Sequence, residues 1–264
     1  MIFGGTFTRA AGCAALIAML WATPGAAQTE RDQADIWKEL EAIKETQATI
    51  LKEIQSLKAV LLGAVRSGGG PRADATIDIA AAQTLGAPIA PVTLIEFTDL
   101  QCPFCGRYAK ETAPRLEREY VATGKVKYVS RDFPIAALHP QAFRAHEAVR
   151  CAGDQGRYWE MRTLVFQNQR AMTPADFERH AQTLKLDVAV FRTCLDKETH
   201  AAAIRKDLEE GRAAGVTGTP TFFIGVTDAS GTKFKASRVL TGAQPFDRFR
   251  EAIEALLQPS TVPK

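Results

Sequence analysis

Two cysteines separated by two residues constrain the fold of this chain more than any other feature. Cys102 and Cys105 follow the apolar, strand-like segment 92–97, and a helix-like segment, 107–120, comes directly after them. A Cys-x-x-Cys pair at such a strand-to-helix turn places its first sulfur at the positive end of the helix dipole, which favours thiolate over thiol. The pattern therefore predicts a site for thiol–disulfide exchange, in which a thiolate attacks a disulfide sulfur.

A metal site is the alternative interpretation of this pair. Structural zinc sites generally use four ligands, but the other cysteines (Cys13, Cys151 and Cys194) form no second Cys-x-x-Cys. The four histidines also lack the spacing of a zinc-binding His pair. Two soft thiolates hold copper(I) with fewer ligands, so a copper(I)-binding envelope protein stays open as an alternative. We predict no resident metal and no cofactor.

Four segments, in this order, resemble the DsbA-like branch of the thioredoxin superfamily: 94–105 (LIEFTDLQCPFC), 131–134 (RDFP), 151–159 (CAGDQGRYW) and 215–225 (GVTGTPTFFIG). The resemblance spans about residues 74–258. It implies an α/β thioredoxin-like fold with a helical insertion, about 134–214. It also implies an extracytoplasmic thiol–disulfide oxidoreductase that acts on unfolded or misoxidised secreted proteins and has a membrane thiol redox partner.

The resemblance also implies roles for individual residues. Cys102 is the expected attacking thiolate, and Cys105 is the more buried resolving thiol. Glu96, on the apolar strand six residues before Cys102, resembles the proton acceptor for the resolving thiol. An outward-pointing Glu96 is the alternative. Pro220 resembles the cis-proline that faces the active site, where the backbone of Thr219 pairs with an extended substrate.

Two residues next to this site favour isomerase chemistry. Phe104 stands where strongly oxidising family members carry His, and a phenyl ring donates no hydrogen bond to the Cys102 thiolate. We therefore expect a pKa of Cys102 of roughly 4.5–7. Thr219 before Pro220 is commoner in isomerases and reductive members. We predict an isomerase or mixed oxidase/isomerase, with Phe104 among the substrate-binding residues; a monomeric DsbA-like oxidase is the alternative.

Cys151 and Cys194 both lie in the predicted helical insertion, 43 positions apart. We interpret them as a structural disulfide. Closing such a loop stabilises the fold by about 4 kcal/mol in the chain-entropy model. A second redox pair or two buried thiols are the alternatives.

The first residues predict export. In the segment 1–27, Arg9 is the only charged residue, an apolar core follows, and small residues precede Gln28. This is the pattern of a secretory signal peptide, and it predicts a periplasmic protein; a retained anchor is the alternative. The four remaining cysteines suit an oxidising compartment. The formal net charge of +3, with no Lys/Arg cluster, gives no support for nucleic-acid binding.

The segment 33–66 carries a heptad repeat. Its core positions alternate in steps of four and three: Ile36, Leu40, Ile43, Gln47, Ile50, Ile54, Leu57 and Leu61. Leu at position a with Ile at position d favours three or four strands, so we predict a parallel coiled-coil homo-oligomer, with a trimer favoured. The Gly-rich segment 67–73 reads as a linker. The alternatives are an amphipathic helix folded back on its own domain and an envelope protein whose main role is interaction through this helix.

After the linker, about 185 residues suffice for one well-packed domain, which the resemblance places at 74–258. Five segments are expected to be strands: 76–79, 92–98, 125–132, 221–225 and 238–241.

Overall fold

The computed structural model describes residues 36–51, 54–55 and 70–258. The chain divides into two compact units, residues 1–66 and 67–264. The predicted signal peptide, 1–27, lies outside the described residues. Within the described ranges, no helix combines the length and apolar character needed to cross a membrane.

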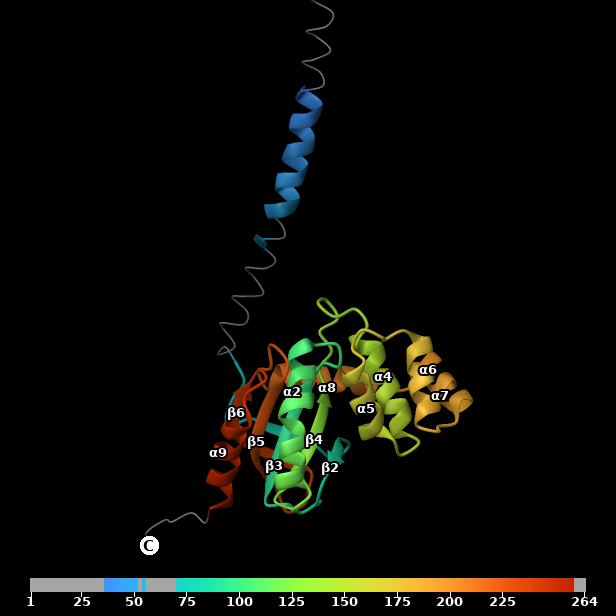
Figure 1. Ribbon diagram of the computed structural model, residues 1–264. Helices are drawn as coiled ribbons and strands as arrows, with labels where there is room; N and C mark the ends of the chain where they lie inside the picture. The colour runs from blue at the N-terminus through green and yellow to red at the C-terminus, as the bar shows by residue number, and fades with distance from the viewer. Residues whose placement is uncertain (1–35, 52–53, 56–69, 259–264) are drawn as a thin grey trace, which may run out of the picture. The chain divides into compact units, whose positions relative to one another are not determined.

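The N-terminal unit is helical over residues 36–51 and 54–55, the blue ribbon in Figure 1. The isoleucines of the heptad repeat are open to solvent in the single chain: Ile36 is 62% exposed, Ile43 54%, Ile50 49% and Ile54 53%. The coiled coil and its oligomer stay predictions, and the whole segment 56–66 lies outside the described residues.

A six-stranded mixed sheet forms the base of the second unit, in the order β1-β6-β5-β3-β4-β2. The strands are β1 (Thr76–Asp78), β2 (Gln83–Leu85), β3 (Val92–Thr98), β4 (Val126–Asp132), β5 (Thr221–Thr227) and β6 (Lys233–Thr241). The central strand β3 runs parallel to β4 and antiparallel to β5. Every residue of β3 is buried, because helices cover both faces of the sheet at this central strand.

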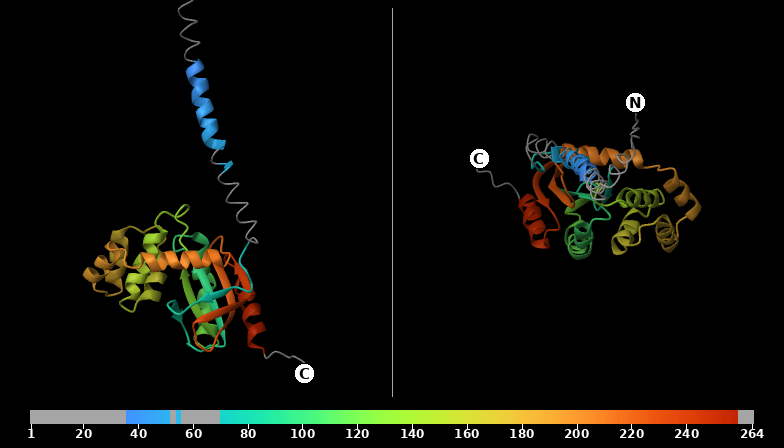
Figure 2. Two further views of the ribbon diagram at one scale, coloured as in Figure 1. Left: turned by 180° about the vertical axis from the view of Figure 1, so that it is seen from behind. Right: turned by 90° about the horizontal axis from the view of Figure 1, so that it is seen from above.

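Helices cover both faces of this sheet and extend beyond its edge. They are α2 (Pro103–Glu111), α3 (Ala113–Leu116), the π-helical turn η1 (Glu117–Val121), α4 (Ala142–Gly153), α5 (Tyr158–Gln167), α6 (Pro174–Thr183), α7 (Val188–Asp196), α8 (Ala201–Ala213) and α9 (Phe246–Leu257). Helices α2 and α9 lie on one face and α8 crosses the other, while α4 to α7 form a lobe beside β4 (Figures 1 and 2). This arrangement confirms the predicted α/β thioredoxin-like fold with a helical insertion.

The alternation of side chains along β3 decides which helix each residue meets. Leu94 belongs to the core cluster under α2 and α9, whereas Ile95 and Phe97 belong to the cluster under α8. Glu96 therefore points to the α2 face. On the other face α8 comes close because Gly211 has no side chain; a Cβ there would lie 2.9 Å from the Phe97 ring.

The structure differs from the predicted elements in three places. The single helix predicted over 107–120 is divided into α2, α3 and η1, because Pro114 provides no N–H for a continuous helix and its ring clashes with the preceding turn. Strand β6 begins at Lys233 rather than at 238. Its exposed lysines interrupt the apolar run from which a strand is predicted. Strand β2 is a short edge strand that has no apolar run to reveal it.

Candidate active site

The Cys-x-x-Cys pair occupies the first turn of α2. Cys102 is the N-cap residue and Pro103 comes first in the helix, where its missing N–H costs nothing. The N–H of Gly106 donates to the Cys102 carbonyl oxygen at 3.0 Å and closes the first helical turn. The Cys102 sulfur therefore lies at the positive end of the helix dipole.

The two thiols of this pair, both free, differ in acidity. A hydrogen bond from the Cys105 side chain, aided by bonds from backbone N–H groups, lowers the pKa of Cys102 to about 6 against the opposing effect of burial. Burial raises the pKa of Cys105 well above its ordinary value, and the negative charges of Cys102 and Glu96 raise it further. At neutral pH the pair consequently holds one thiolate, on Cys102, and one thiol, on Cys105.

The loop before β5 lies opposite the Cys102 sulfur. The Thr219–Pro220 peptide bond is cis. When protonated, the Cys102 thiol donates to the Thr219 carbonyl oxygen at 3.5 Å. Phe104, in the first turn of α2, is 54% exposed and carries the Arg107 guanidinium 5.3 Å from its ring centre. The structure thus brings the backbone of Thr219 to the reactive sulfur and leaves the ring of Phe104 open to solvent.

Glu96 is completely buried beneath α2. One carboxylate oxygen, Oε2, accepts hydrogen bonds from the Tyr128 hydroxyl and the Arg162 guanidinium. The other, Oε1, has no hydrogen-bond partner among the described residues. An outward-pointing Glu96 is therefore wrong. A buried carboxylate with a free oxygen, close enough to influence the pKa of Cys105, has the character needed in a proton acceptor.

Sequence reasoning missed the two partners of Glu96. Tyr128 comes from β4, and burial raises its pKa well above the ordinary value, so it stays a hydrogen-bond donor. Arg162 comes from α5 and is only 4% exposed. The signal for Arg162 was present, because it lies on the helical face that also carries the buried Tyr158 and Val165. A charged residue on an apolar face needs a buried partner of opposite charge.

A second carboxylate, Asp99, ties the active-site loop together. Its oxygens accept from the Cys102 N–H at 3.1 Å, the Ile135 N–H at 2.7 Å and His139 Nδ1 at 2.9 Å. Its own N–H donates to the Cys105 sulfur at 3.5 Å. Sequence reasoning also missed this residue, which holds the turn before α2 against the loop after β4.

The other cysteine pair lies in the helical lobe. Cys151 of α4 and Cys194 of α7 form a disulfide, with their Cα atoms 5.9 Å apart. Within the described residues, one group of three side chains has atoms close enough together to bind a metal: Cys151, Cys194 and His200. Its two sulfurs are bonded to each other in the disulfide. Cys102 and Cys105 belong to no such group in the same part of the chain.

Comparison with known families agrees with this geometry. A family model described as thioredoxin matches residues 80–255. The chain belongs to the thioredoxin family. Disulfide bond formation protein D of Bacillus subtilis is 26% identical over 184 residues, which cover 66% of this chain and 76% of that protein. Na(+)/H(+) antiporter NhaA 3 of Salinispora tropica is 38% identical over 135 residues, and the chain spans only 20% of that relative's length.

Solved structures show the same fold. Oxidised BdbD from Bacillus subtilis superposes with a TM-score of 0.62 at 23% identity, over 72% of this chain and 99% of that one. Pseudomonas aeruginosa DsbA2 gives a TM-score of 0.55 at 25% identity, over 69% and 98%. The resemblance to DsbA-like proteins is thereby confirmed.

Proposed function

We propose that this protein is a DsbA-like thiol–disulfide oxidoreductase that exchanges disulfides with secreted proteins. The observation that carries the proposal is the unequal pair of thiols in the first turn of α2. The pKa of Cys102 is lowered to about 6, largely by the hydrogen bond from Cys105, and that of Cys105 is raised by burial. The thiolate faces the Thr219 carbonyl, where an extended substrate has a backbone to pair with.

The exchange proceeds in two steps. The Cys102 thiolate attacks one sulfur of a substrate disulfide, and the other substrate sulfur leaves with the bonding electron pair, which gives a mixed disulfide. Cys105 then passes its proton to Glu96 and attacks the Cys102 sulfur. The second substrate thiolate leaves, so the enzyme is oxidised to a disulfide and the substrate gains two electrons. The reverse sequence oxidises a substrate dithiol.

Within this class we favour an isomerase or mixed oxidase/isomerase that works as a periplasmic oligomer. The absence of a hydrogen-bond donor in the side chain of Phe104 and the Thr219–Pro220 pair support this choice. The solvent-exposed isoleucines of residues 36–55 support assembly through the N-terminal helix. An assembly would present several Cys102 sites around one misoxidised substrate. An isomerase needs Cys102 in its reduced form, and a membrane thiol redox partner would keep it reduced.

Reactivation of a substrate with scrambled disulfides tests the proposal on the full chain after signal removal. A variant with Ile43→Asp and Ile50→Asp places charges at two core positions of the heptad repeat. Its matched control, Ala42→Asp with Ala48→Asp, adds the same charges on the outer face of the helix. An oligomeric isomerase loses reactivation in the core variant and in Cys102→Ser, but keeps it in the control.

Other outcomes distinguish the alternatives. Oxidation of a reduced substrate without reactivation would overturn isomerase function and leave a DsbA-like oxidase. Full activity of a monomeric core variant would overturn the role of the oligomer. Stoichiometric copper(I) retention that needs Cys102, together with no disulfide exchange, would overturn the oxidoreductase proposal.

A further inference from the structure

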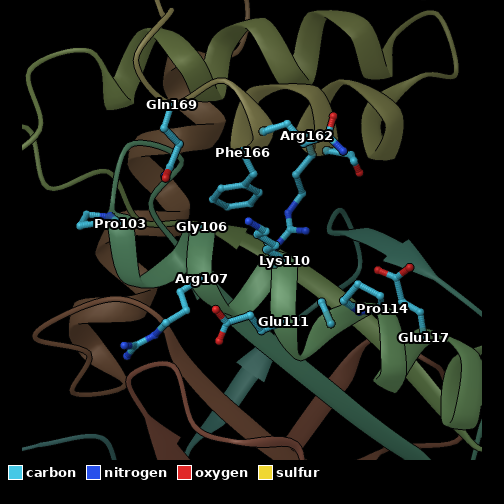
Figure 3. A pocket seen from close by; sticks show the side chains of 14 residues that line it. Pro103, Gly106, Arg107, Lys110, Glu111, Pro114, Glu117, Arg162, Phe166 and Gln169 are labelled. Atoms are coloured by element: carbon cyan, nitrogen blue, oxygen red, sulfur yellow. The ribbon is translucent and has the colours of Figure 1, made fainter.

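A pocket of about 760 Å³ lies between α2 and α5, beside the active-site turn. Figure 3 shows it from close by. Pro103 and Gly106 line one end, next to Cys102, and the wall continues along α2 into α3 as far as Glu117. Gln169 also lines it and donates to the Cys102 carbonyl oxygen at 2.8 Å. The pocket is therefore continuous with the loop that carries the reactive sulfur.

Two cationic side chains converge in this pocket. The ends of Lys110, from α2, and Arg162, from α5, point into the same part of it, beneath Phe166 (Figure 3). Nη2 of Arg162 bonds to Glu96 on the buried side, and its Nε makes no hydrogen bond within the described part of the chain. Lys110 takes part in no ion pair among the described residues. Their mutual repulsion is thus only partly compensated, by Glu96.

Among the described residues, the two carboxylates that line the pocket form no ion pair with Lys110 or Arg162, although the charge of Arg162 acts on the pKa of Glu117. Glu111 lines the wall, but its carboxylate points away from Lys110 in Figure 3. Glu117 lies beyond Pro114 at the other end, where burial raises its pKa. A nearly buried guanidinium, an unpaired ammonium and the ring of Phe166 together form a site suited to an aliphatic carboxylate.

We propose that this pocket binds an Asp or Glu side chain of the protein substrate while the substrate's cysteine reacts with Cys102. The inference rests on the proposed exchange function and adds a substrate preference to it. Lys110 lies seven residues into α2 after Pro103, which is about 10 Å at 1.5 Å per residue. An extended chain covers that distance in about three to four residues. Substrates with an acidic residue at about that spacing from the cysteine gain an ion pair.

The test uses single-step exchange on the full chain with Cys105→Ala, in which Cys102 is joined to thionitrobenzoate as a mixed disulfide. Peptides with one cysteine and either Glu or Gln about four residues away, on either side, attack Cys102 and release coloured thionitrobenzoate. The rate of each peptide with the protein is divided by the rate of the same peptide with a small aromatic disulfide. This normalisation removes the effect of Glu on the intrinsic reactivity of the peptide thiol. The readout is the Glu/Gln rate ratio.

Lys110→Met is the diagnostic variant, because Lys110 is exposed and its loss leaves the buried Glu96–Arg162 pair intact. Lys235→Met, which removes an exposed lysine from β6, is the matched control. We expect Lys110→Met to lower the Glu/Gln ratio about threefold and Lys235→Met to leave it unchanged. High salt should lower the ratio of the parent protein in the same way.

The outcomes separate this inference from the proposed function. A Glu/Gln ratio of one in the parent protein, or a ratio that Lys110→Met does not change, overturns the substrate preference while exchange itself stands. If no peptide reacts faster with the Cys102 mixed disulfide than with the small aromatic disulfide, the exchange function is overturned. In that case, amide NMR shifts near Lys110 with peptides that carry Ser in place of Cys still decide the question: shifts with the Glu peptide alone support the site, and equal or absent shifts overturn it.

Discussion

The two cysteine pairs of this protein each contain a deeply buried cysteine but differ in chemistry. Cys102 is 4% exposed and Cys151 1%, yet the first is a free thiol with a lowered pKa and the second is half of a disulfide. Exposure therefore does not separate them. Cys102 is the N-cap residue of α2 and lies three positions before Cys105 in the chain. Cys151 and Cys194 join two helices across 43 residues.

What separates the pairs is the set of groups around each sulfur. Hydrogen bonds from Cys105 and backbone N–H groups lower the pKa of Cys102, while Cys105 lies near the carboxylate of Glu96. In the lobe, Cys151 packs in the same core cluster as the active-site pair and the partly buried Cys194 packs against it, and the two sulfurs are bonded to each other. The first environment stabilises a thiolate and so favours exchange; the second favours a permanent bond that stabilises the fold.

The largest difference between the pairs should appear on removal of one sulfur from the active-site pair. Cys102→Ser removes the proposed attacking thiolate, so exchange with a substrate disulfide should fall to the uncatalysed rate. Cys105→Ser keeps the attacking thiolate and should accumulate the mixed disulfide, which gel shift after acid quenching detects. Exchange by the Cys102→Ser protein at an undiminished rate would show that the reactive sulfur is another one.

Loss of the second pair should affect stability rather than exchange. The double variant Cys151→Ala, Cys194→Ala opens a loop of 43 residues, so the free energy of unfolding should fall by about 4 kcal/mol. Urea unfolding of parent and variant measures this difference. If the folded variant loses exchange activity as well, the two pairs are coupled, and the contrast between them fails.

The parts of the site that lie close together in the chain could be predicted from the sequence. Strand β3, the turn at Cys102 and the helix that follows are a local pattern, and the structure has the same strand bounds as predicted. The ion pair of Glu96 and Arg162 joins residues 66 positions apart. It depends on how the lobe packs against the sheet, which one sequence without a structure does not specify.

Glu96 provides the next test, because it is buried whereas Asp154, the acid beside Cys194 of the lobe pair, is exposed. Glu96→Gln removes the proposed proton acceptor, and we expect resolution of the mixed disulfide to slow about a hundredfold while the first attack keeps its rate. Rapid-quench kinetics separates the two steps. Glu117→Gln, on the same side of the sheet, is the control for loss of a partly buried acid. Resolution at the parent rate in a folded Glu96→Gln protein would remove the assignment.

The pH dependence of alkylation should also distinguish Cys102 from ordinary thiols. Its pKa of about 6 predicts that iodoacetamide reacts fast above pH 6 and slowly below it. The folded-state pKa lies below the unfolded-state value, so ionisation of Cys102 stabilises the reduced fold above the unfolded-state pKa, and this contribution is lost as the pH falls through about 6. The contribution is measured as the difference in free energy of unfolding by urea between the reduced parent protein and the Cys102→Ser variant, at a series of pH values. A difference between them that is independent of pH would contradict the lowered pKa.

The smallest expected effect concerns Phe104, the residue between the active-site cysteines that cannot donate a hydrogen bond. Phe104→His adds an N–H donor and, when protonated, a positive charge, both of which favour the thiolate. We expect the alkylation midpoint of Cys102 to fall by about one unit and the protein to become a stronger oxidant. Phe104→Leu, which removes the ring and adds no donor, should leave the midpoint in place. An equal fall in both variants would mean that ring removal, rather than a missing donor, sets the acidity of Cys102.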